Sequence, residues 1–571
     1  MILLQQNSNN SPLTVSPGYK WVALSNTTLG ILMASLNSNI ILIALPAIFR
    51  GMKVDPMATS NVPYMLWMLM GYTVVTATLL VSFGRISDIY GRVRLYNVGF
   101  AIFAVTSILL YFVPGRGTAG VQQLVILRLA QGVGAGFLFS NSTAIITDVF
   151  PSNQRGMAMG INQIAAIGGA LVGLILGGVL ADFDWKLVFL VSVPAGLFGT
   201  VWAYIKLKET SKPDHSQKID WGGNFTFAIG LTVLLLALTY GIMPYGHDKM
   251  GWRNPIVIWG CILGIALLVA FVIVELKVKS PMFHLKLFRI RAFACGSISL
   301  FLSSVARGGL QFMLIIWLQG IWLPLHGYSF ESTPLWAGIY MIPMMVGFFA
   351  MGPLSGILSD RFGARWFSTG GMIITVIGFV LLTLLPANFN YTAFFVLLLI
   401  LGVGMGMFSA PNTTAIMNSV PPNLRGASAG MRSTLQNTGV ALSMTLYFSI
   451  ILIGMVHNLP PILSHGLVAQ GIPTAEATKI ASLPPTTALF SAFLGYNPMG
   501  QMIPHATLTS LSTTAQHTLL GTRFFPMTIP PAVMSSMRVA FYISAAMSAV
   551  AAVASFLRGG RYVYDEKEDT K

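Results

Sequence analysis

Residues 84–91 are Gly-Arg-Ile-Ser-Asp-Ile-Tyr-Gly, and residues 356–363 are Gly-Ile-Leu-Ser-Asp-Arg-Phe-Gly. The second stretch lies 272 residues after the first and shares its glycines and its Ser-Asp pair. A second repeat has an offset of 270 residues, because Gly-Val-Gly-Ala-Gly at 132–136 returns as Gly-Val-Gly-Met-Gly at 402–406. The Arg-Gly pair at 155–156 likewise returns at 425–426. Matching order and spacing indicate that the chain contains an internal duplication.

The composition places this duplication in a membrane. Of the 571 residues, 54% are hydrophobic and 9% are charged, whereas soluble domains carry roughly 25% charged residues. A helix needs ~20 apolar residues to cross a bilayer. By that rule the sequence predicts fourteen spans, near 21–49, 62–83, 95–113, 121–142, 157–180, 186–206, 221–243, 255–276, 292–323, 335–357, 366–386, 391–417, 426–456 and 536–558.

The basic residues orient these spans. Of the 33 lysines and arginines, 21 fall on the side of the N-terminus, nine on the other side and three inside predicted helices. Bases accumulate on the cytoplasmic side of membrane proteins, so we expect a multi-pass protein of the cell membrane with both termini in the cytoplasm. The net charge of +16 therefore reflects topology and not a nucleic-acid partner.

The two cysteines, Cys261 and Cys295, lie in or beside apolar runs. They offer neither a disulfide framework nor a thiolate metal site. The sequence predicts no metal and no cofactor, and it lacks the charged clusters that a membrane enzyme would need.

Both copies of the repeat lie on the same side of the membrane, so the repeat is parallel. Parallel halves around a central cavity that they expose alternately are typical of secondary transporters. We therefore predict an all-α membrane fold with two pseudo-symmetric six-helix bundles and two inserted helices. The expected parts are a cytoplasmic segment (1–20), the first bundle (21–206), a linker with the inserted helices (207–291), the second bundle (292–558) and a cytoplasmic tail (559–571).

The loop at 84–94, the sequence Arg128 to Gly132 and the flanks of the inserted helices carry a resemblance to a known family. The chain resembles the fourteen-helix drug:proton antiporter, or multidrug efflux, branch of the major facilitator superfamily over nearly its whole length. The resemblance implies efflux of small amphiphilic molecules, protons as coupling ion, the lipid bilayer as environment and a monomeric state.

The two repeated loops are predicted gates. Glycines permit tight turns, and a carboxylate at a helix end pairs with a neighbouring guanidinium. By resemblance, Asp88 with Arg92 and Asp148 would latch the two halves in the outward-facing state. The alternative is an ordinary positively charged turn. The predicted gating residues are Gly84, Asp88, Gly91, Arg92, Asp148, Gly356, Asp360 and Gly363.

All 17 acids map to loops, termini or helix ends. The family usually carries an aspartate in the first span, and its counterpart here is Asn37, which does not titrate. Arginines remain inside the spans, with Arg307 near the midplane and Arg128 and Arg432 nearer the ends. A midplane charge normally faces a polar cavity, so Arg307 and Arg128 are predicted to act on substrate or coupling. The alternative is a structural arginine.

The other predicted substrate or coupling residues are polar or aromatic and lie in the same spans: Gln131, Asn141, Gln311, Trp317 and Asn412. We expect Asn37 and Arg307 at similar depths on opposite sides of the cavity. A cavity with guanidinium groups and amides but no carboxylate favours a neutral or anionic amphiphile over a cation.

The fifth span presents small residues that let helices pack closely. The glycines are Gly160, Gly169, Gly173, Gly177 and Gly178. Their spacing resembles the antiporter motif of the family, although the usual proline is Leu174 here. Packing alone is the alternative.

The predicted function is proton-coupled efflux of drug-like or lipophilic compounds by alternating access. One alternative is an exporter of a specific organic anion or lipid without classical proton coupling, and another is a non-transporting sensor or scaffold. The extracellular loop at 457–535 is expected to cover the outer mouth or to rest on the lipid surface.

Overall fold

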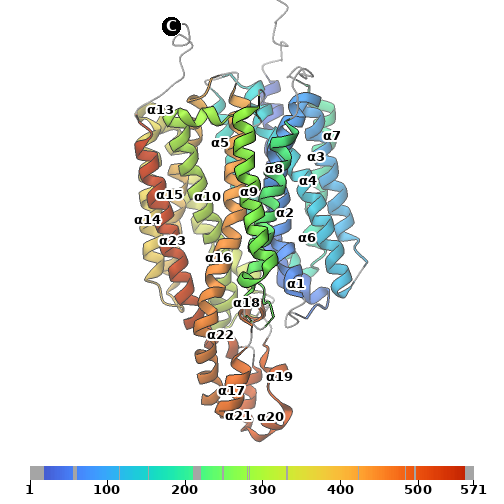
Figure 1. Ribbon diagram of the computed structural model, residues 1–571, viewed down its shortest axis with the longest axis vertical. Coiled ribbons are helices and arrows are strands. Elements are labelled where there is room, and N and C mark those ends of the chain that lie inside the picture. Colours follow the sequence, from blue (N-terminus) through green and yellow to red (C-terminus); the bar gives the residue numbers. More distant parts are fainter. Residues whose placement is uncertain are drawn as a thin grey trace, which may run out of the picture.

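The computed structural model describes residues 18–55, 61–114, 116–151, 154–209, 220–246, 248, 250–278, 281, 283–329, 332–421, 424–482, 484–493, 497–521 and 523–559. These residues form an elongated bundle of helices, with a smaller group of short helices projecting from one end (Figure 1). Of the predicted cytoplasmic segments 1–20 and 559–571, residues 1–17 and 560–571 lie outside the described residues.

Seven helices form the N-terminal half: α1 (Tyr19–Gly51), α2 (Val62–Tyr90), α3 (Arg92–Tyr111), α4 (Gly117–Val149), α5 (Arg155–Phe183), α6 (Leu187–Leu190) and α7 (Ser192–Lys206). The inserted pair is α8 (Trp221–Gly241) and α9 (Pro255–Lys277), with short helices η2 (Gly251–Arg253) and η3 (Leu285–Arg289). Helix α8 packs against α9, α2 and α16, so the inserted pair lies against both halves.

The C-terminal half contains α10 (Arg291–Trp317), the π-helix η4 (Leu318–Trp322), α11 (Leu323–Leu325), α12 (Thr333–Tyr340), α13 (Ile342–Phe362), α14 (Ala364–Thr383), α15 (Tyr391–Asn418), α16 (Arg425–Ala469) and α23 (Pro530–Leu557). Between α16 and α23 lie α17 (Thr474–Ala481), α18 (Pro485–Phe493), α19 (Met499–Met502), α20 (His505–Ser510), α21 (Thr513–Leu520) and α22 (Phe524–Thr528).

Fourteen spans among the described residues are long and apolar enough to cross a membrane. This confirms the predicted number and the all-α fold. Helices α6 and α7 together make one span, as do α10 to α11 and α12 with α13. The ends shift by several residues, and the last span, for example, begins at Pro530 and not near 536.

The duplication is visible in the packing of α4 and α15. A methyl group at Gly134 would lie 2.9 Å from the carbonyl oxygen of Gly99 in α3. At the repeated position, a methyl group at Gly404 would lie 2.8 Å from the carbonyl oxygen of Gly371 in α14. Glycine is required at both places because the helix backbones touch. The same contact therefore builds both halves.

The region 457–535, which the sequence predicts as an extracellular loop, contains helices. Helix α16 continues to Ala469, thirteen residues beyond its predicted end, and six short helices follow. Leu459, Leu463 and Leu467 are fully buried at a spacing of four, which is one face of a helix. Helices α18 and α22 contact η4. The group of helices α17–α22, which we name the helical cap, thus rests on the C-terminal half (Figure 1).

The two ends of the bundle differ in how the halves meet. We name the end where α1 begins and α23 ends the termini face, and the other end the cap face. Toward the cap face, Ile41, Leu45 and Phe49 of α1 belong to one apolar core that continues through the C-terminal half. Toward the termini face, Val93 and Tyr96 belong to a core made only of N-terminal residues. An apolar core common to both halves therefore lies toward the cap face, whereas the core around Val93 and Tyr96 belongs to the N-terminal half alone.

Candidate substrate cavity and gate network

A central cavity of about 190 Å³ lies between the two halves at mid-depth. It is lined by α1, α2, α4 and α5 on the N-terminal side and by α10, α13, α15 and α16 on the C-terminal side. Its N-terminal polar wall contains Ser35, Ser38, Asn39, Tyr72, Asn162 and Gln163, and its C-terminal polar wall contains Arg307, Gln311, Arg432, Ser433, Gln436 and Asn437. No carboxylate is among the described residues that line it.

Arg307 lies on the wall of this cavity, as predicted from the sequence. Its guanidinium forms no hydrogen bond or ion pair with any described residue. Gln311, one turn further along α10, also lines the cavity and donates a hydrogen bond of 3.2 Å to Oδ1 of Asn39. That bond joins the two halves across the cavity.

Arg128 is placed differently. It is fully buried inside the N-terminal half, where it donates to Oδ1 of Asn37 and, at 2.7 Å, to Oε1 of Gln131. Its guanidinium lies 4.6 Å from the ring centroid of Tyr72, a cation–π contact. Asn37 in turn donates to Oγ of Ser192 at 2.8 Å. These contacts link α1, α2, α4 and α7.

The prediction that Asn37 faces the cavity opposite Arg307 is therefore wrong for this structure. Asn37 is fully buried and turned toward Arg128, while its neighbours Ser38 and Asn39 line the cavity. Gln131 is also buried away from the cavity, where it donates to Oγ of Ser107 at 2.8 Å.

Three further predicted residues lie away from the cavity wall, which corrects their assignment to the substrate path. Trp317 is fully buried in the C-terminal half, donates to the carbonyl oxygen of Ala387 at 3.1 Å and packs against Phe389. Asn412 and Asn141 lie toward the termini face. Asn412 donates to the carbonyl oxygen of Gly296, and Asn141 donates to the carbonyl oxygen of its own helix, so their polar groups serve local packing.

Arg432, the third arginine inside the predicted spans, also lies at the cavity. Arg432 lines the cavity from α16 and donates to Oε1 of Gln436 at 3.1 Å, while its Nε is buried without a partner. The polar positions 432, 433, 436 and 437 follow helical spacing within an apolar span, so the signal was present.

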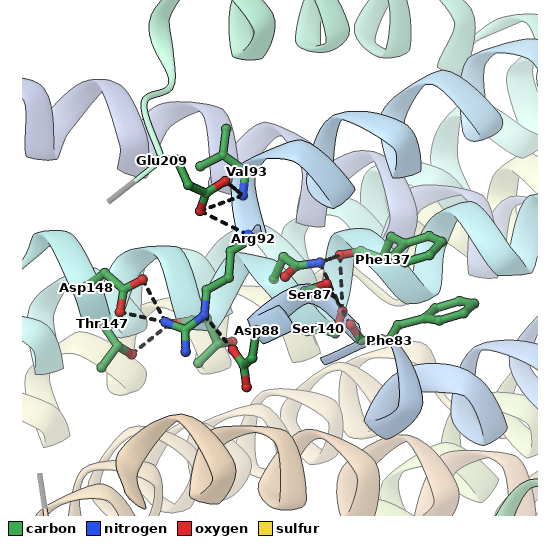
Figure 2. A network of polar contacts seen from close by, with 12 residues as sticks. Phe83, Ser87, Asp88, Arg92, Val93, Phe137, Ser140, Thr147, Asp148 and Glu209 are labelled. Carbon is green, nitrogen blue, oxygen red and sulfur yellow. Dashed lines mark hydrogen bonds and ion pairs between the residues drawn. The ribbon is translucent and has the colours of Figure 1, made fainter. Parts of the chain in front are cut away.

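A charged network lies at the termini face (Figure 2). Arg92, the first residue of α3, donates to Oδ1 of Asp88 at 2.8 Å and to both carboxylate oxygens of Asp148 at 2.6 and 2.7 Å. Asp88 belongs to α2 and Asp148 to α4. The predicted gating residues of the first loop therefore meet. These contacts lie within the N-terminal half and join α2, α3 and α4.

Glu209 completes the network from the segment after α7, and the sequence analysis did not single it out. Its carboxylate accepts hydrogen bonds from the backbone N–H groups of Arg92 and Val93, both at 3.0 Å. An acidic group at a helix N-terminus stabilises the unpaired amides there. Gly91 has φ of 107°, and a methyl group on it would lie 2.8 Å from Oε2 of Glu209. The glycine is thus needed for both backbone and space.

The second repeated loop shares the backbone of the first, and Asp360 stands at the position of Asp88. Gly363 has φ of 87° and connects α13 to α14 as Gly91 connects α2 to α3. Gly84 and Gly356 have comparable surroundings, with Ser140 at 4.0 Å and Ala410 at 3.6 Å from an added methyl group. The side chain of Asp360 lies outside the described residues.

The glycines of α5 divide into two groups. Gly169, Gly173 and Gly177 face carbonyl oxygens of Leu32, Leu36 and Ile40, so α5 packs on the backbone of α1. Gly178 faces the backbone of Leu335 in α12, across the halves. Gly160, by contrast, has no neighbour within 4 Å of an added methyl group, which corrects its assignment to helix packing.

This fold and cavity define a membrane transporter. The family model of the Major Facilitator Superfamily matches residues 27–444. The chain belongs to the major facilitator superfamily, and this confirms the family expected from the sequence.

Two relatives of this chain are named for different transported compounds or resistances. The riboflavin transporter RibZ of Clostridioides difficile (strain 630) is 27% identical over 446 residues, which cover 77% of this chain and 90% of that protein. Multidrug resistance protein 3 of Bacillus subtilis (strain 168) is 28% identical over 425 residues, which cover 73% of this chain and 77% of that protein.

Solved structures share the fold at lower identity. The proton:xylose symporter XylE matches with a TM-score of 0.52 and 14% identity, covering 85% of this chain and 96% of that chain. A bacterial homolog of the human lysosomal transporter Spinster, inward-facing and occupied, matches with a TM-score of 0.51 and 15% identity, covering 97% of this chain and 100% of that chain.

Proposed function

We propose that this protein is a proton-coupled exporter of drug-like or lipophilic compounds that works by alternating access in the cell membrane, as a monomer with both termini in the cytoplasm. The observation that carries the proposal is the central cavity, which both halves line at mid-depth. The common core toward the cap face and the separate cores toward the termini face support an inward-facing state.

The proton route must avoid the cavity, because no carboxylate is among its described lining residues. Asp88 and Asp148 are the candidates that the charged network offers, since both hold Arg92. Protonation of Asp148 would remove an acceptor pair from Arg92 and free α3 and α4 to move relative to each other. In this proposal the proton therefore binds in the charged network at the termini face and not in the cavity.

The test is dye-reported proton movement in proteoliposomes that contain the purified protein. Cationic, neutral and anionic amphiphiles are added in turn, and uptake of labelled substrate is followed in parallel. Proton flux triggered by substrate in the wild type, and reduced in Asp148→Asn, is the expected result. An exposed carboxylate far from the network, Asp184→Asn, is the matched control. Absence of uptake for every class would favour a sensor or scaffold.

An exporter of an organic anion or lipid without classical proton coupling is the second candidate. The observation that favours it is the pair of cavity arginines, Arg307 and Arg432, with no carboxylate beside them on the described wall. Uptake of labelled substrate without proton flux in the same vesicles would select this candidate.

A further inference from the structure

Both guanidinium groups of the central cavity come from the C-terminal half. Arg307 belongs to α10 and makes no hydrogen bond with a described residue, and Arg432 belongs to α16 and bonds only to the neutral amide of Gln436. The buried Nε of Arg432 has no partner. Two cations that share one enclosed space without a counter-ion repel each other, and an anion between them removes that repulsion.

The opposite wall supplies neutral groups that suit an anion and its polar neighbours. Asn39 and Gln163 present side-chain amides, and Tyr72 and Ser38 present hydroxyl groups. Amides and hydroxyls can donate hydrogen bonds without adding charge. Recognition of charge thus belongs to the C-terminal wall.

A second cavity of about 240 Å³ adjoins the first on the side of the termini face. Gln163 and Phe348 line both cavities, so the two spaces adjoin at these side chains. The second cavity lies between α5 of one half and α13 and α15 of the other, and its lining is mainly apolar and without any charged side chain among the described residues.

Two features of the second cavity fit it to an apolar tail. Gly160 on its wall leaves open space, since an added methyl group there has no neighbour within 4 Å. Met157 and Ile357 on its wall are 47% and 65% exposed, so the cavity opens to the outside of the bundle beside these two side chains. An apolar chain is stable there because it is removed from water.

We propose that the substrate is an anionic amphiphile, with its carboxylate, phosphate or sulfonate group between Arg307 and Arg432 and its apolar tail past Phe348 in the second cavity. The inference rests on the proposed function as a transporter and names the substrate class of the same cavity. A lipid of the inner leaflet and a free acid from solution share this chemistry.

The test is equilibrium binding to the purified full chain in nanodiscs of zwitterionic phosphatidylcholine, which supply no competing anionic lipid. Four probes separate head from tail: decanoate, decyltrimethylammonium, decanol and acetate. Decanoate is expected to bind at least about tenfold more tightly than the other three, because only it has both an anionic head and a tail. Competition of decanoate with a lysophosphatidic acid, placed in the disc or added in solution, distinguishes the two sources.

Variants assign the head group. Arg307→Gln and Arg432→Gln are each expected to weaken the binding of decanoate by about tenfold. The binding of decanol should not change, because the uncharged alcohol makes no charge-assisted contact with either arginine. Arg307→Lys should keep most of the affinity. Arg538→Gln, which removes an exposed arginine outside the cavity, is the matched control. Thermal unfolding of each variant checks that it folds.

Variants also assign the tail. Gly160→Leu places a large side chain in the second cavity. It is expected to weaken the binding of decanoate several-fold and to leave the binding of acetate unchanged. Gly430→Leu is its control, because Gly430 also has open space around it but lines neither cavity.

Equal affinities for decanoate and decyltrimethylammonium, or equal losses for decanoate and decanol in the arginine variants, would overturn the proposal. Those results would leave transport itself intact if labelled cations still enter the proteoliposomes. Loss of uptake for all probes with selective binding of decanoate would instead contradict the transport function and keep the substrate class.

Discussion

The two halves place an arginine in opposite ways around the same repeated scaffold. With the 270-residue offset, Arg128 and Asn37 correspond to Leu398 and Arg307. In the N-terminal half the arginine of α4 is buried and bonded to the asparagine of α1. In the C-terminal half Leu398 is fully buried, and the arginine has moved to α10 and faces the cavity. In one half the cation takes part in internal hydrogen bonds, and in the other it lines the cavity.

The two repeated loops also differ in their charged residues. Arg92, which holds two carboxylates, corresponds to Ala364, and Asp148 corresponds to Asn418. The nearby arginine of the second loop, Arg365, lies 3.9 Å from the ring centroid of Phe556. Among the described residues the network around Arg92 lies in the N-terminal half, which carries the proposed coupling charges. The proposed substrate-binding charges lie in the C-terminal half.

The largest difference in stability between the two halves is expected when each arginine is replaced with leucine. Arg128→Leu leaves Oδ1 of Asn37 and Oε1 of Gln131 without their donor, so the free energy of unfolding should fall by about 3 kcal/mol. Arg307→Leu removes an unpaired group, so it should change stability by less than about 0.5 kcal/mol. Denaturant or thermal unfolding of the purified proteins measures both.

A double variant controls for the size of the side chain. Adding Asn37→Leu to Arg128→Leu removes both partners and should recover part of the loss, because an unmade buried hydrogen bond costs more than an absent one. Equal losses for Arg128→Leu and Arg307→Leu would contradict the separation into structural and ligand-binding arginines.

The loop arginines give the next largest effect. Arg92→Gln removes the charge-assisted bonds to Asp88 and Asp148, and we expect it to lower the free energy of unfolding by about 2 kcal/mol at low salt. Part of this loss should disappear at 1 M NaCl, since the three side chains are partly exposed and their attraction is screened. Arg365→Gln, which loses ring contacts, should cost about 0.5 kcal/mol. Equal costs would place equivalent gates in both halves.

The loop glycines separate backbone strain from the charged network. Gly91→Ala and Gly363→Ala both force an alanine into positive φ, which should cost each protein a similar amount. Only Gly91→Ala also displaces Glu209 from the N-terminus of α3, so it should cost about 1 kcal/mol more. In the background Glu209→Ala the difference between the two glycine variants should vanish. A persisting difference would mean that Glu209 is not its cause.

The sequence predicted the fold because its strongest signals are local and repeated. Fourteen apolar runs and two pairs of motifs fix the number of spans and the parallel duplication. The helical extension of α16 was missed, although Leu459, Leu463 and Leu467 keep the helical period. The predicted end at 456 came from the length needed to cross a bilayer, and a helix that leaves the bilayer is not bound by it.

The cavity was predicted only in part. The position of Arg307 was predicted because a charged side chain inside an apolar span is costly in lipid and normally faces a polar cavity. Asn37 and Trp317 were misplaced, because the side of a helix that faces a neighbour depends on packing between bundles, which hydropathy does not contain. Asn39, two residues after Asn37, lines the cavity instead. Glu209 was missed because its partners are backbone N–H groups 115 to 117 residues away.

The smallest expected effect concerns the bond that joins the two walls. Gln311 donates to Asn39 at 3.2 Å across the cavity, and this neutral bond should contribute about 0.5–1 kcal/mol to the conformation in which the walls are this close. If it forms only in that conformation, its loss shifts the balance between conformations by about two- to fivefold. A double-mutant cycle with Asn39→Ala and Gln311→Ala isolates the coupling. The readout is the rate at which a cysteine placed at Gly160, on the second cavity, reacts with a thiol reagent. We expect the effects of the two substitutions on the labelling rate to be non-additive. Strictly additive effects would mean that the two amides are not coupled to each other. Each amide would then act on the ligand alone, and the apolar core at the cap face would hold the walls together.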